Sequence, residues 1–184
     1  MEGCCNSCGG NVDTRVVRLT FKREELLYDI KNYAFVEADV MGEPGVRADD
    51  KLRHAQHQLA DIGENGNVDR VNRILAVVHT AVVDMLYPYT KEEPVEEEIS
   101  DVLETPEEYV VVLTVPITVS RTTLQLLSKL IHEYMVYRVM ADWLSITNPQ
   151  ASVHWMEKAE STQMDIERTK SVYGRPLTRK MSTF

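Results

Sequence analysis

Residues 118–149 read TVSRTTLQLLSKLIHEYMVYRVMADWLSITNP, and this stretch decides the fold. Thr118 to Ser120 can cap a helix, and Asn148-Pro149 ends that helix and starts another. The helix predicted between these signals reaches Thr147 and is about 40 Å long at 1.5 Å per residue. Its apolar side chains form two stripes, Leu124, Leu127, Ile131, Met135 and Val139 in one, and Leu126, Leu130, Tyr134, Tyr137, Ala141 and Leu144 in the other. A helix that is apolar on most sides is typical of the centre of a bundle or of a subunit interface.

Three more helices are predicted before this central helix. Apolar residues at helical spacing indicate one helix from about residue 21 to Met41, a second from about Arg47 to Ile62, and a third from Val68 to Leu86. The Gly and Pro residues at positions 42–45 end the first of them, and Pro88 ends the third.

The segment after Asn148 is predicted to form a last, mostly polar helix. Pro149 suits the first helical position, and Gly174 with Pro176 ends the helix. Its apolar edge is narrow, so we expect it to bury little against its own domain; the edge comprises Trp155, Ala159 and Ile166. The histidines and tryptophans of this half of the chain are expected to pack inside the subunit or at a subunit interface: His132, His154, Trp143 and Trp155.

The strongest strand signal is Tyr109 to Val115, which is rich in β-branched residues. A lone strand leaves its backbone groups unpaired, and the partner we predict is Val95 to Leu103, joined through the turn-prone residues 104–107. Residues 11–20 alternate weakly and suit either a short strand or an extended arm. The predicted fold class is therefore mainly α: a bundle of about five helices with a β-hairpin inserted at about 91–117 and an extended C-terminal tail.

Length and composition indicate one domain. The chain has 184 residues, of which 43% are hydrophobic and 27% charged, values that are ordinary for a globular protein with a buried core. We assign residues 1–12 to a flexible N-terminus, 13–173 to the helical domain and 174–184 to an extended basic tail. The apolar runs are too short for a membrane span and the N-terminus lacks a secretory pattern, so we expect folding in a reducing cytoplasm.

All three cysteines, Cys4, Cys5 and Cys8, lie in the predicted flexible N-terminus. An odd number at a terminus argues against a disulfide framework. Cys5 and Cys8 have the spacing of half a zinc site, but no second cysteine pair or nearby histidine completes a tetrahedron. A terminus without metal is the favoured interpretation.

Charge is unevenly distributed along the chain. The net charge is −9, which argues against nucleic-acid binding as the main function. Residues 91–108 hold nine acids and one base, whereas residues 168–184 hold five bases and no acid. Solvated patches or a frayed terminus would explain this simply, but bases interleaved with apolar residues are unusual for a solubilising end. We predict that a partner binds the tail through Arg175, Pro176, Leu177, Arg179, Lys180, Met181 and Phe184.

The sequence contains no Gly-rich phosphate loop, no His-Glu-x-x-His and no Gly-x-Ser-x-Gly. One cluster, Asp50, His54, His57 and Asp61, shares a side of the predicted second helix at a spacing that suits a divalent metal. A solvated polar face explains this cluster more simply. We therefore expect no enzyme activity, no cofactor and no bound metal.

The order of predicted elements resembles that of the head-to-tail adaptor (connector) proteins of tailed bacteriophages and, more loosely, the ring proteins below the portal in crAss-like phages. The stretch that carries the resemblance is YMVYRVMADWLSITNP at 134–149, followed by WMEKAE at 155–160 and the helix to Val172. The resemblance covers residues 15–184 as an architecture. The Cys-containing start and the acidic predicted hairpin depart from it.

The resemblance implies a structural virion protein at the head–tail junction, made in the host cytoplasm. It would form a homo-oligomeric ring, a dodecamer, that binds the phage portal protein through residues 175–184 and neighbouring subunits, tail or ring proteins through residues 95–115. DNA would pass through the ring without specific binding, and an acidic lining would help because it repels phosphates. Two alternatives stay open: a cellular helical protein-interaction module that uses the same tail, and a metal-binding helical enzyme built on the cluster at 50–61.

Overall fold

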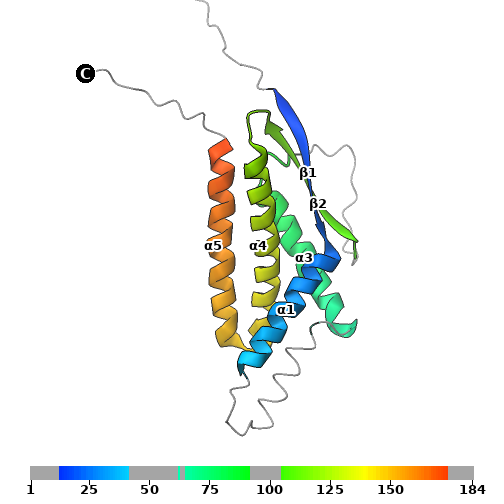
Figure 1. Cartoon of the computed structure of the whole chain (residues 1–184). Helices are drawn as coiled ribbons and strands as arrows, with labels where there is room; N and C mark the ends of the chain where they lie inside the picture. The colour runs from blue at the N-terminus through cyan, green and yellow to red at the C-terminus, as the bar shows by residue number, and fades with distance from the viewer. Residues whose placement is uncertain (1–12, 42–61, 63–64, 92–104, 174–184) are drawn as a thin grey trace, which may run out of the picture.

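A computed structural model describes residues 13–41, 62, 65–91 and 105–173 (Figure 1). The elements in chain order are β1 (Thr14–Lys22), α1 (Arg23–Met41), α3 (Asn65–Met85), β2 (Glu108–Pro116), α4 (Arg121–Thr147) and α5 (Pro149–Tyr173). The described part is mainly helical, as predicted. The predicted second helix lies outside the described residues except for Ile62, which is buried. None of the described helices combines the length and hydropathy that a membrane span requires.

The boundaries of α4 follow from its capping residues, as predicted. Ser120 is the N-cap, and its hydroxyl oxygen accepts a hydrogen bond from the Thr123 amide at 3.1 Å. At the other end the Asn148 amide donates to the Leu144 carbonyl at 2.8 Å, while the Asn148 side chain accepts from the Ala151 amide at 3.3 Å. A single residue, Asn148, thus ends α4 and caps the start of α5.

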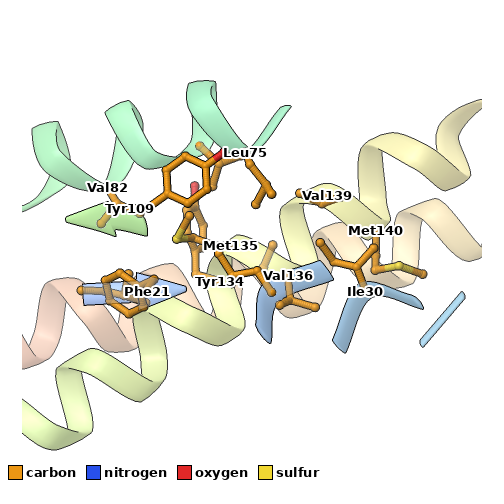
Figure 2. Packing of buried hydrophobic residues seen from close by; sticks show 14 of the residues in the cluster. Phe21, Ile30, Leu75, Val82, Tyr109, Tyr134, Met135, Val136, Val139 and Met140 are labelled. Atoms are coloured by element: carbon orange, nitrogen blue, oxygen red, sulfur yellow. The ribbon is translucent and has the colours of Figure 1, made fainter. Parts of the chain in front are cut away.

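The core surrounds α4. Its first predicted stripe is entirely buried, whereas its second stripe is buried only in part, since Leu126 is 49% exposed. Figure 2 shows Tyr134, Met135 and Val139 of α4 near Tyr109 of β2 and Leu75 of α3. Helix α1 contributes Ile30, among other buried residues, to the same cluster. One continuous core therefore joins the helices to the sheet.

Helices α4 and α5 lie side by side and run in opposite directions (Figure 1). They share the largest contact between any two described elements. The predicted apolar edge of α5 is buried along its whole length, at Trp155, Ala159 and Ile166. The expectation that α5 buries little against its own domain is therefore wrong, because a narrow edge suffices when it lies along a helix as long as α4.

The sheet differs from the predicted hairpin. Strand β2 pairs antiparallel with β1, from Lys22 opposite Glu108 to Thr14 opposite Pro116. The prediction that residues 95–103 pair with β2 is wrong about the partner, and that segment itself lies outside the described residues. Residues 14–22 form the short strand that the weak alternation allowed, and the strand displaces the expected start of α1 from about residue 21 to Arg23.

The edge of β2 that faces away from β1 contacts α3 and the turn that follows it. The Thr114 amide donates to the Tyr89 carbonyl at 2.8 Å, and His79 Nε2 lies 3.0 Å from the Val110 carbonyl oxygen. Helix α3 and the turn after it thus use two of the groups that a strand on this edge would need.

The burial pattern of α4 predicts how substitutions affect stability. Met135→Ala should lower the free energy of unfolding by about 2–5 kcal/mol, because the Met135 side chain is fully buried and its removal leaves a cavity. Leu126→Ala, on the same helix but half exposed, should cost less than about 1 kcal/mol. Chemical denaturation followed by circular dichroism measures both. Equal losses for the two variants would contradict this description of the core.

Candidate functional site

Several predicted site residues lie outside the described part of the chain. These are the tail residues 175–184, the cluster Asp50, His54, His57 and Asp61, and Cys4, Cys5 and Cys8. Within residues 13–41, 62, 65–91 and 105–173, no group of three or more His, Cys, Asp or Glu side chains is placed to hold a metal ion. What the described surface offers instead is two hollows and an exposed apolar patch.

The first hollow, here called the acid-lined hollow, lies between α1 and α4. It has a volume of about 440 Å³ and is lined by Glu24, Glu25, Tyr28, Asp29 and His132. His132 Nε2 lies 2.8 Å from Asp29 Oδ2, so this pair joins the two helices across the hollow. Three carboxylates beside an aromatic ring make it suited to a cationic side chain with an apolar stem.

The second hollow, the α4–α5 groove, has a volume of about 370 Å³. It is lined by Thr123, Leu126, Leu130, Asp165, Arg168 and Thr169. Its apolar floor comes from α4, and the charged rim comes from α5. Met164, which precedes the rim residue Asp165, is 67% exposed. Apolar surface at a polar rim favours burial of an apolar side chain from a partner.

The two hollows lie on different sides of α4. At 3.6 residues per turn, His132 lies about 120° from Leu126 and about 160° from Leu130 around the helix axis. The acid-lined hollow also involves α1, whereas the groove involves α5. The described part of the chain therefore presents two surfaces of different chemistry in different directions.

An apolar patch on α1 was not predicted from the sequence. Tyr28 and Phe35 are each 67% exposed and Val36 is 55% exposed. Tyr28 and Phe35 are seven residues apart, so they share one side of the helix, away from its buried stripe. In the sequence, the only sign of this patch is the aromatic pair at a spacing of seven residues. The helical periodicity of the sequence indicates only the stripe that faces the core.

The aromatic residues Tyr33, Tyr137 and Trp155 join α1, α4 and α5. The Trp155 ring centroid lies 5.0 Å from that of Tyr33 and 5.6 Å from that of Tyr137. Trp155 Nε1 donates to Glu37 Oε1 at 2.9 Å, and the Lys158 ammonium lies 4.2 Å from the indole centroid. Trp155 is thus a core anchor within its own chain, one of the two roles expected for it. His154, by contrast, is exposed.

Comparison with known proteins finds no relative of this chain. No protein-family model, curated protein or solved structure matches the chain.

The aromatic cluster predicts a loss of stability at high pH. Burial, followed by the charge of Glu133 and by Tyr33, raises the pKa of Tyr137 to about 12. The folded state thus holds this proton more tightly than the unfolded chain, whose tyrosines titrate near 10. The stabilisation is complete below about pH 10 and is lost as the pH rises towards about 12.

Tyr137→Phe should therefore reduce the decline in melting temperature between pH 9 and 12. It should not abolish the decline, because burial also raises the pKa of Tyr109 and of Tyr134. Tyr87→Phe, at an exposed tyrosine, is the matched control and should leave the decline unchanged. Identical profiles for wild type and Tyr137→Phe would refute the assignment.

Proposed function

We propose that this chain is a structural virion protein whose copies form a ring that joins a phage portal to the tail. The observation that carries the proposal is the pair of non-equivalent surfaces on different sides of α4. The acid-lined hollow and the α4–α5 groove differ in charge and in polarity. The acid-lined hollow, with its three carboxylates, is not self-complementary, which favours contact between different surfaces of successive copies.

Contacts of this head-to-tail kind generate closed rings when the rotation between copies closes, and filaments when it does not. The exposed patch at Tyr28, Phe35 and Val36 adds apolar area beside the acid-lined hollow. Exposed apolar patches of this kind mark protein interaction sites. A bundle built on two long paired helices also supplies the rigidity that a joint between two assemblies requires.

The remaining parts of the proposal concern the partners. The basic tail at 174–184 would dock on the portal protein, with Leu177, Met181 and Phe184 in apolar pockets and the bases against acidic groups. The negative net charge would keep passing DNA from sticking to the ring. Neither an enzyme activity nor a cofactor is part of this proposal, and the copy number we propose is a dodecamer.

The ring proposal predicts the effect of charges placed on the α1 patch. Wild-type protein should form discrete oligomers in mass photometry and rings in negative-stain images. The double substitution Tyr28→Glu and Phe35→Glu should weaken assembly at least tenfold, because it places charge in a buried contact. Val77→Glu, at a 70% exposed apolar residue of α3, is the control and should assemble normally. Wild-type monomers at all concentrations, alone and with portal protein, would sink the proposal.

The tail proposal predicts a separable loss. A chain truncated after Tyr173, where α5 ends, should keep its helical circular dichroism and melting temperature, because no described element is removed. Its affinity for the portal protein should fall at least tenfold in surface plasmon resonance. A full-length chain with residues 174–184 in scrambled order serves as the control for charge alone. Undiminished binding by the truncated chain would show that the portal contact lies elsewhere.

A further inference from the structure

Within the described part of the chain, the outer edge of β1 is an open strand edge. At the two ends of the β1–β2 ladder, the bonds Ile117 N to Asp13 O (3.0 Å) and Arg23 N to Glu107 O (2.9 Å) use odd-numbered residues on the β1 side. In an antiparallel ladder, hydrogen-bonded pairs alternate with pairs that are not hydrogen-bonded. The even-numbered residues of β1 therefore direct their N–H and C=O groups away from β2. Among the described residues, nothing pairs with these groups of Val16, Arg18 and Thr20.

The two edges of the sheet differ in this respect. The edge of β2 is occupied by the Tyr89 carbonyl and the His79 side chain. No other described residue makes such a contact with the edge of β1, although Val16, Arg18 and Thr20 are exposed there. Val16 is 70% exposed. An exposed strand edge is a template for pairing with another strand. The structure thus leaves one edge of the sheet available to another chain.

The charge of β1 restricts which strand can pair there. Within residues 14–22 there are three bases, Arg15, Arg18 and Lys22, and no acid. Among the described residues, Lys22 has one ion pair, a distant and exposed one with Glu25 at 4.0 Å, which contributes little. A second β1 strand would place like charges together, and so would the basic tail at 174–184. An acidic strand is the complement.

We propose that the outer edge of β1 accepts residues 95–103 of a second copy as a third strand of the sheet. This segment reads VEEEISDVL and has four acids and no base. Three of its four apolar residues, Val95, Ile99 and Leu103, would fall on one face of a strand by the two-residue period. Backbone bonds would provide affinity, and the acids opposite the bases of β1 would select this partner.

A second copy suits this role better than the same chain. The segment leaves the described structure at Lys91, just after Tyr89 bonds to β2, and re-enters at Thr105, just before β2 begins. Both ends are therefore attached on the β2 side of the sheet, whereas the open edge lies on the far side of β1. The inference rests on the proposed ring and names the surfaces through which successive copies would pair.

A charge exchange between two variants tests the proposal. Variant one carries Arg18→Glu with Lys22→Glu, and variant two carries Glu96→Lys with Glu98→Lys. Each alone should assemble at least tenfold more weakly than wild type in sedimentation velocity. An equimolar mixture should recover assembly, because each variant then offers the other a complementary charge. Recovery only when all four substitutions are in one chain would show pairing within a chain and overturn the proposal, as would unchanged assembly of variant one.

A second variant pair tests the backbone contact. Thr20→Pro removes a backbone N–H that points away from β2, a change that edge strands tolerate. Thr20→Ala shortens the side chain but keeps this N–H. Thr20→Pro should weaken assembly at least tenfold with no loss of helical circular dichroism, and Thr20→Ala should not. Equal behaviour of the two variants in assembly would overturn a backbone contact.

A peptide of residues 92–104 separates this inference from the ring itself. If the wild-type chain is monomeric, the ring proposal fails, and the peptide is then added to the full chain. Slower hydrogen exchange at the amides of Val16, Arg18 and Thr20 would support the open edge as a docking site without a ring. No change in exchange at these amides would overturn the docking site as well.

Discussion

The burial of α4 is the constraint on which the rest of the structure depends. A helix with apolar side chains around most of its circumference must be covered on most sides before it is stable in water. Helix α5 covers one side along its whole length, while α1, α3 and the sheet cover the others. Leu126 marks where the cover ends, and the α4–α5 groove lies there. The arrangement of every other described element follows from that requirement.

Periodicity and capping predicted α4 and α5 because both signals are local. Ser120 and Asn148 specify the ends through bonds to residues three or four positions away, so the sequence around them contains the needed information. The extent of α5 burial was missed because it depends on the length of contact with α4. The width of the apolar edge alone does not reveal that length.

The sheet shows why the partner of a strand is harder to predict than the strand itself. A strand at 109–115 was evident from composition, yet its partner is determined by what covers the other edge. Tyr89 and His79 occupy that edge, and neither contact has a sequence signature. For the surfaces, periodicity showed which side of α1 faces inward. It drew no attention to Tyr28 and Phe35, because an exposed aromatic pair has meaning only when its neighbours are known.

The long separation between β1 and β2 has a consequence for synthesis. The first strand emerges from the ribosome well before its partner, since Lys22 pairs with Glu108 and Thr14 with Pro116. At roughly 5–20 residues per second, the N-terminal strand waits about 5 to 20 s without its partner. During this interval both of its edges are unpaired and Leu19 and Phe21, which are buried later, lack most of their cover. Nascent chains on neighbouring ribosomes could then pair wrongly, so translation rate and chaperone supply should govern the yield of folded protein.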